Sequence, residues 1–301
     1  MSIGTMIRNA IIAVVGVLVI WVLAIGLFSS PSSNLYKPEA LAPEATDQER
    51  ATVIANAVNY ALQDQLGSLF GFLPNDLVAP WVVDNTVNYQ MGVIYATRPA
   101  SEVMSNDVAR YGNRDTIDPR LADATSRFFS YSEKVWGFLF IYDAEGKYKA
   151  GIKNWEAWAK SIGTDGKNAG VFNMKSDDVY NIIKYCLVMT DYALGVLNNT
   201  DVGHFKTDNN VYYAKGVCAV TANIFRALIA VDSSVIDRGG IENVNEALHR
   251  FDMIEEFNPL YVMAGGNQVG DAMLPNHTAA LARHIDVANN RIADILSAMA
   301  R

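Results

Sequence analysis

The chain has 301 residues, half of them hydrophobic, with 24 Lys and Arg against 32 Asp and Glu and a net charge of −8. An acidic chain is a poor partner for nucleic acid, because that binding depends on basic residues that neutralise phosphates. The length is sufficient to bury a sizeable core, as one large domain or as two closely packed lobes.

An uncharged apolar run covers residues 9–28 and is the strongest single feature of the sequence. A helix of about 20 residues spans roughly 30 Å, which is the hydrocarbon thickness of a bilayer. We therefore expect residues 1–28 to form a transmembrane anchor whose residues 9–28 contact lipid. A cleaved signal peptide is the alternative, although its apolar region is usually shorter and no A-x-A site ends this one.

The charges on either side of the run indicate its orientation. Arg8 precedes it, whereas the next basic residue, Lys37, is followed by acidic residues. Because short flanks rich in Lys and Arg stay in the cytoplasm, we expect the amino terminus inside and the rest of the chain outside. In a bacterium this predicts an inner-membrane protein with a periplasmic C-terminal domain. That domain has a net charge of about −9, so it is not expected to lie flat on anionic lipid.

Residues 29–45 contain three prolines and four serines without an apolar period, which is typical of an extended linker. Thr46 and Glu49 then form a capping box, so a helix is expected to start there and to end at Gly67. From this point residues 46–301 carry mainly helical signals. We predict an all-α fold, with one N-terminal transmembrane helix followed by a bundle-like domain of antiparallel helices.

The stretch 71–83 contains two prolines and turn residues and is interpreted as an ordered loop. A helix is predicted over 84–98, and Pro99 is expected to kink or break it before a second piece over 100–111. The apolar stretch 135–142 has no second strand with which to pair, so a buried turn or short helix is favoured over a strand.

The remaining helices are predicted from their caps and their apolar spacing. They comprise 118–129, 143–162, 177–197 with Ser176 as its cap, 209–236, 241–257 and 276–301. Because about ten residues join 177–197 to 209–236, an antiparallel hairpin is expected there. Trp155 and Trp158 lie three residues apart and are expected in the core, with an exposed binding platform as the alternative.

The histidines and acidic residues match no catalytic, cofactor or metal motif. His277 and His284 are seven residues apart, whereas metal-binding pairs on a helix are usually four apart. Adjacent carboxylates such as Glu255 and Glu256 are better explained as solvated helix residues. We therefore predict no catalytic residue, no metal ligand and no cofactor.

Cys186 and Cys218 both lie in predicted helices with apolar neighbours. A disulfide between them is one possibility in an oxidising compartment, provided that the helices bring their α-carbons within about 7 Å. Two buried free thiols are the other.

Residues 71–93 (GFLPNDLVAPWVVDNTVNYQMGV) resemble DUF2333, a family of bacterial proteins with a single membrane anchor. The similar features are G-(F/W)-L-P-N-D-L, then D-N, then N-(F/Y)-Q-(L/M)-G-V. Two looser similarities lie at 143–148 and at 212–214, where Lys215 and Gly216 replace the R-A pair of the family. The resemblance implies a helical envelope protein and brings no activity, cofactor or catalytic residue with it.

The same segment is a possible partner-binding loop near the membrane. Its candidate residues are Phe72, Leu73, Pro74, Asn75, Asp76, Trp81, Asp84 and Asn85. The alternative, which we favour, is a structural loop that short polar side chains hold by hydrogen bonds to the backbone.

The leading hypothesis is a non-enzymatic scaffold or accessory subunit of an envelope assembly. Its partners would be the bilayer, other envelope proteins and possibly a second copy of the chain, but not nucleic acid. One alternative is an enzyme that acts on cell-wall glycan or peptide through acidic residues. Another is a module that binds lipid or another apolar ligand in an internal cavity.

Overall fold

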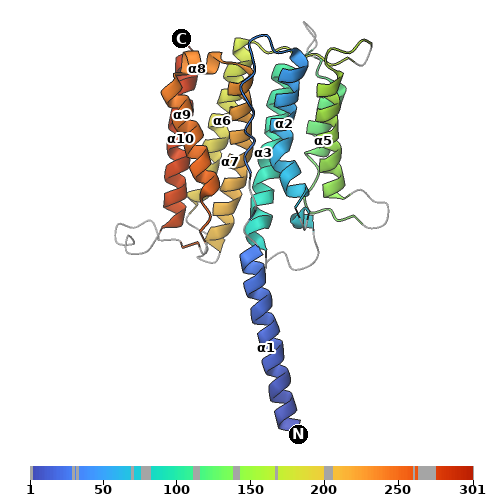
Figure 1. The fold of residues 1–301 in the computed structure, drawn as a ribbon, viewed down its shortest axis with the longest axis vertical. Helices are drawn as coiled ribbons and strands as arrows, with labels where there is room; N and C mark the ends of the chain where they lie inside the picture. The colour runs from blue at the N-terminus through green and yellow to red at the C-terminus, as the bar shows by residue number, and fades with distance from the viewer. Residues whose placement is uncertain are drawn as a thin grey trace.

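The computed structural model describes residues 3–28, 31, 34–68, 71–75, 83–110, 116–137, 143–166, 169–199, 206–259, 262–263 and 276–300. All regular structure within them is helical, which confirms the all-α prediction. Figure 1 shows α1 (Ile3–Phe28) projecting alone from one end of a body that contains the other helices. We call this end of the body the anchor end.

Helix α1 exposes its large apolar side chains instead of packing them. Those exposed are Ile3, Met6, Ile7, Ile11, Ile12, Val14, Val15, Val17, Val19 and Ile20. Among the described residues, one helix is long enough and apolar enough, by length and composition, to cross a membrane. It is α7 (Thr207–Val231), whose apolar stretch is 89% buried, so it is a core helix of the body. The described residues of α1 include a shorter apolar helical stretch, Ile3–Val17.

A strap, residues 34–45, runs along the body from the anchor end to the start of α2 (Figure 1). Tyr36 donates its backbone N–H to Oδ1 of Asn223 at 2.7 Å. Leu41 donates its backbone N–H to the carbonyl of Ala230 at 2.9 Å. The described part of the segment predicted as a linker is therefore held to α7 at Tyr36 and Leu41.

Helix α2 (Asp47–Leu66) has the predicted capping box at Thr46 and ends at Gly67. Helix α3 (Asp84–Val108) continues through Pro99, so the predicted division into two helices is wrong. Proline removes the hydrogen bond that residue 99 would donate to the carbonyl of Tyr95, and the Tyr185 hydroxyl donates to the adjacent carbonyl of Ala96 at 3.0 Å.

The predicted helix over 118–129 is present in two parts. They are α4 (Pro119–Asp123), capped by Asp118, and the π-helical turn η3 (Ala124–Phe128). Residues 135–137 form no helix and Trp136 is 44% exposed, so this part of the stretch predicted to be buried is not; residues 138–142 lie outside the description. Helix α5 (Ala144–Ser161) begins at the predicted cap, Asp143.

The C-terminal half contains α6 (Ser176–Leu197), α7, α8 (Ser234–Gly239), α9 (Ile241–Glu256) and α10 (His277–Met299). Lys175, not Ser176, precedes α6, and its backbone N–H donates to Asp178. Helix α7 ends at Val231 instead of 236, because Asp232 is extended and starts a turn into α8.

Helix α7 is the centre of the body. Nearly all of its residues from Val211 onward are buried, and it packs against α2, α3, α6 and α9. The end of α6 lies beside the start of α7, as the predicted hairpin requires. Because a central helix is surrounded on every side, it is apolar all round rather than on one face.

Candidate functional site

Two glycines let α3 and α7 cross with their backbones in contact. A Cβ atom added at Gly92 would lie 2.1 Å from the carbonyl oxygen of Tyr213. A Cβ added at Gly216 would lie 2.1 Å from the carbonyl oxygen of Tyr89. This close approach brings side chains of α3 and α7 together beside α6, where the main surface pockets lie.

Three tyrosines from these helices form a cluster at the surface. The rings of Tyr95 on α3 and Tyr192 on α6 are stacked, with centroids 4.3 Å apart and planes 15° apart. Tyr213 on α7 lies 6.0 Å from Tyr95 and 6.3 Å from Tyr192, and its hydroxyl is 3.3 Å from that of Tyr192. Burial, followed by interactions with Tyr192, raises the pKa of both Tyr95 and Tyr213, so both remain protonated.

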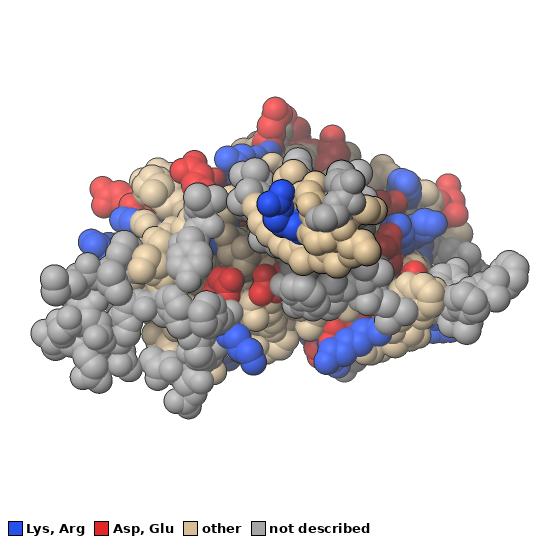
Figure 2. Space-filling view, turned by 90° about the horizontal axis from the view of Figure 1, so that it is seen from below, with Lys and Arg blue, Asp and Glu red and all other residues tan. Residues whose placement is uncertain are grey.

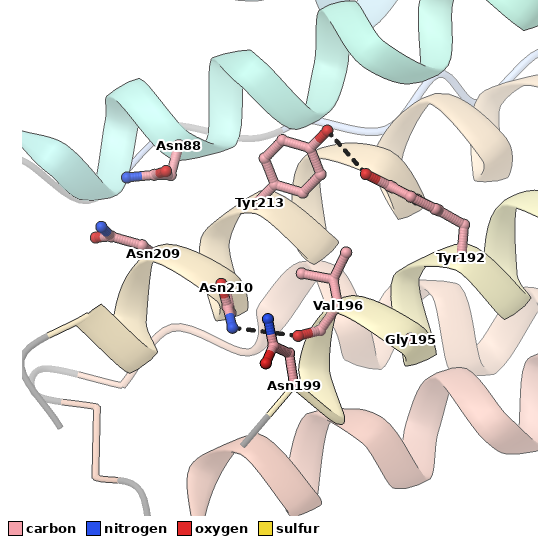
Figure 3. Close-up of a pocket in the computed structure, with 8 residues that line it drawn as sticks. All are labelled: Asn88, Tyr192, Gly195, Val196, Asn199, Asn209, Asn210 and Tyr213. Carbon is pink, nitrogen blue, oxygen red and sulfur yellow. Dashed lines mark hydrogen bonds between the residues drawn. The ribbon is translucent and has the colours of Figure 1, made fainter. Parts of the chain in front are cut away.

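On one side of this cluster, at the anchor end, is a pocket of about 470 Å³ that is open to solvent (Figure 3). We call it the asparagine pocket; its lining residues are Asn88, Tyr192, Gly195, Val196, Asn199, Asn209, Asn210 and Tyr213. They come from the start of α3, the end of α6 and the start of α7. Figure 3 shows Asn88 on α3 and Asn209 on α7 at the same side of the pocket.

Hydrogen bonds hold two of these amides in place. Asn88 donates from Nδ2 to the carbonyl of Asp84 at 2.7 Å, and Asn210 donates from Nδ2 to the carbonyl of Val196 at 3.2 Å. In contrast, Oδ1 of Asn209 is buried and accepts no hydrogen bond in the described part of the chain. A buried acceptor without a donor is costly, and because this atom has almost no accessible surface, a ligand or water would reach it only after the side chain turned.

On the other side of the cluster is a second open pocket of about 420 Å³. Tyr213 lines both pockets and therefore separates them. The second pocket has charged residues, Arg98 and Glu133, which the asparagine pocket lacks among its described lining residues. Residues of α3 and α7 contribute to the lining of both pockets, and we call the two pockets together the groove.

The predicted partner-binding loop is adjacent to this region, but its first residues are not available to a partner. Phe72 and Leu73 are buried, and the Phe72 ring packs edge-on against Tyr148 at 5.0 Å. Gln90 fixes the loop, since its Oε1 accepts the backbone N–H of Leu73 at 2.9 Å and its Nε2 donates to the carbonyl of Gly71 at 3.0 Å. For these residues the loop has a structural role.

The other residues of that loop are placed as follows. Pro74, Asp84 and Asn85 are partly exposed at the anchor end. Burial, and then the charge of Asp208, raises the pKa of Asp84. The side chain of Asn75 is not described, and Asp76 and Trp81 lie outside the described residues. A partner-binding role for this part of the loop stays a prediction.

Cys186 and Cys218 are free and buried, on α6 and α7, and the disulfide considered above is not formed in this structure. Burial raises the pKa of both thiols, that of Cys218 to about 12. Neither cysteine is therefore a thiolate nucleophile at neutral pH. Trp155 and Trp158 are fully buried and pack edge to face at 5.4 Å, so they are core residues and not a binding platform.

In the described part of the chain, no group of three or more His, Cys, Asp or Glu side chains is arranged to hold a metal. His277 accepts the backbone N–H of Met263 at 3.0 Å, and His284 lies 3.2 Å from Arg250. His204 lies outside the described residues. Sequence reasoning did not find the asparagine pocket, although the four asparagines at helix ends were a signal that could have suggested it.

The comparison with protein families identifies the chain. The family model described as "uncharacterized protein conserved in bacteria", DUF2333, matches residues 1–200. The chain belongs to the DUF2333 family. This match confirms the resemblance at 71–93, and it leaves the similarity at 212–214 outside the matched residues. No curated protein and no solved structure matches the chain.

In this DUF2333 protein the motif residues of 84–93 have distinct positions in the candidate site. Asn88 lines the asparagine pocket, Met91 lines the second pocket, and Gly92 is required for the contact of α3 with α7. Tyr89 and Gln90 are buried beneath them. Part of the segment that resembles the family motif therefore lines both pockets.

Proposed function

We propose that this DUF2333 protein is a single-pass membrane protein of the bacterial envelope whose helical body acts outside the cytoplasm as a scaffold or accessory subunit. The observation that carries the proposal is α1, a helix that exposes its large apolar side chains along residues 3–20. Exposed apolar surface on this scale needs a cover. The uncharged run over 9–28 has the length that a bilayer requires.

The strap supports a fixed arrangement of the body relative to the anchor. Leu35 is already buried in the core, seven residues after the end of α1 at Phe28. Because extended chain covers at most about 3.6 Å per residue, Leu35 lies no more than about 25 Å from Phe28 along the chain. The anchor end of the body, with the asparagine pocket, would therefore stay close to the membrane.

The surface around α1 agrees with attachment through the helix rather than through charge. Figure 2 shows the anchor end with α1 pointing toward the viewer, and acidic and basic side chains are intermixed on the described surface around it. Binding to anionic lipid would be favoured instead by a cluster of Lys and Arg.

The scaffold role is supported by the tyrosine cluster and its two open pockets. Tyr95 is 42% exposed although its ring is stacked on Tyr192. Exposed, pre-ordered aromatic side chains are enriched at protein interfaces, because they offer a large contact area at low entropic cost. The described lining of the asparagine pocket lacks the pair of carboxylates that the enzymatic alternative needs.

Two measurements test the location. In alkaline carbonate, which releases peripheral proteins, we expect the chain to remain in the membrane pellet and to be released only by detergent. A reporter fused after Arg301 should be active in the periplasm. Release by carbonate, or a reporter active only in the cytoplasm, would overturn the proposed topology.

Site-specific cross-linking tests the scaffold role. A photo-activated amino acid at Tyr95 should give one discrete cross-linked product in intact cells, and the same substitution at Ile241 serves as the control. Ile241 is 50% exposed and lies on α9, away from the groove. A product of twice the chain mass would identify a second copy. Equal, diffuse products at both positions would contradict a defined partner surface.

A further inference from the structure

The asparagine pocket has a chemical character that the scaffold role does not use. Its described lining offers four amide side chains and two tyrosines, and no charged residue. Its volume of about 470 Å³ lies within the range of small-molecule sites. The uncharged, hydrogen-bonding lining therefore favours some classes of ligand over others.

Three classes are disfavoured. A charged ligand would lose hydration without gaining a counter-charge. A purely apolar ligand would cover the remaining exposed donors and acceptors of the lining amides without giving them hydrogen bonds. An extended peptide usually pairs with the free edge of a β-strand, whereas this pocket is built from helices whose backbone groups are already bonded.

A neutral ligand that both donates and accepts hydrogen bonds, and that also has apolar faces, fits the lining. A sugar ring has this character, because its hydroxyl groups surround a ring with C–H faces. Each asparagine amide offers donors and an acceptor, and the tyrosine rings offer flat apolar surface.

We propose that the asparagine pocket binds a neutral sugar unit of a glycan chain, with the asparagine amides as its hydrogen-bonding groups and Tyr213 as the apolar wall. The second pocket shares Tyr213 with the first, so a neighbouring unit of the same glycan could contact it. This binding site adds a ligand to the proposed function and does not depend on membrane topology, because binding is measured on purified protein.

The test is calorimetric titration of the full chain in detergent with chitotetraose and with cellotetraose, both neutral tetrasaccharides. We expect saturable binding of at least one of them by the wild-type protein. No binding of either sugar up to about 10 mM would overturn the proposal.

Two variants locate the site. Asn209→Ala removes one amide of the pocket lining and should weaken binding about tenfold. Gly195→Leu fills the pocket: a Cβ at Gly195 meets no atom within 4 Å, and leucine favours the helix, so folding should not suffer. This variant should abolish measurable binding.

Asn106→Ala is the matched control, because Asn106 is a half-buried asparagine in the last part of α3, distant in sequence from Asn88. It should bind as the wild type does. Binding that survives both Asn209→Ala and Gly195→Leu would overturn the assignment to this pocket, whatever the outcome of the membrane and cross-linking experiments.

Discussion

At the scale of single residues, Lys215 is the least expected feature of the core. It is 2% exposed on α7 and donates from Nζ to the carbonyls of Glu255 and Phe257, at 3.1 and 2.7 Å. These carbonyls are at the end of α9, where the helix dipole and unpaired acceptors favour a cation. Lys215 thus links the central helix to the end of α9.

Burial lowers the pKa of Lys215 to about 8, against the attraction of Glu255. The unfolded chain therefore binds more protons than the folded chain between about pH 8 and 10.5, and this residue's contribution to stability rises with pH in that window. We predict that wild-type protein gains up to about 3 kcal/mol relative to Lys215→Met across it. Urea unfolding at the two pH values measures the difference.

Lys153→Met is the control for this prediction, since Lys153 is exposed on α5. Its unfolding free energy should follow the wild type at both pH values. If Lys215→Met also ran parallel to the wild type, the lysine would not titrate with a lowered pKa in the folded protein.

At the scale of helices, the contact of α3 with α7 determines the candidate site. Gly92 and Gly216 face the partner helix's backbone reciprocally, and both Tyr213 and Tyr89 belong to the contact. Because the two helices touch through backbone atoms, side chains on either side of the contact are held at defined distances. Tyr95, Tyr192 and Asn88 owe their relative positions to this crossing.

Gly92→Ala and Gly216→Ala should each destabilise the body by about 3 kcal/mol or more, because the new methyl group would meet a backbone carbonyl and the helices would have to separate. Gly195→Ala is the control: its Cβ meets nothing within 4 Å, and a helical alanine should stabilise the protein by about 0.5–1 kcal/mol. Thermal unfolding measures all three. Equal effects of the three substitutions would contradict a tight crossing.

At the scale of the whole molecule, α1 and the strap have different relations to the body. α1 projects from it (Figure 1), whereas the strap contributes buried Leu35 and two backbone hydrogen bonds to α7. The boundary between the anchor and the body is thus expected before the strap, so that the strap belongs to the body. The boundary at residue 45, which composition suggested, is later than the start of packing.

Deletion of residues 1–28 should leave the stability of the body unchanged within about 0.5 kcal/mol and yield a protein soluble without detergent. Deletion of residues 1–41 should cost at least about 2 kcal/mol more, because it removes the Leu35 side chain and the bonds to Asn223 and Ala230. Urea unfolding of both truncated chains measures this difference. Equal stabilities would show that the strap does not hold to α7.

The sequence predicted the start of a helix correctly where a neighbouring capping residue determines that start. The capping residues Thr46 and Asp118 were identified from sequence, and each accepts the backbone hydrogen bond expected of it. The predicted break at Pro99 is wrong, since α3 is continuous there, and the predicted end at 236 is wrong, since Asp232 ends α7. In both places contacts distant in sequence, or a turn not recognised beforehand, overrode the local pattern.

The candidate site depends almost entirely on tertiary structure. Asn88 and Asn209 are separated by more than a hundred residues, and their proximity follows from the crossing at Gly92 and Gly216. The sequence also does not show that Phe72 and Leu73 are inaccessible to a partner. Both are buried in the body, and Gln90 accepts the backbone N–H of Leu73. Composition does not reveal which way such side chains point.

The sequence by itself determined the all-α class, the apolar N-terminal run, most helix starts and the family, because these depend on local hydrogen bonding, hydrophobic period and motif. Only the tertiary structure decided that α7 is the core, that the linker is a strap, and that amides and tyrosines from three helices surround one pocket. The reason is physical: close packing of helices depends on which surfaces fit together, and that fit is a property of pairs of distant segments.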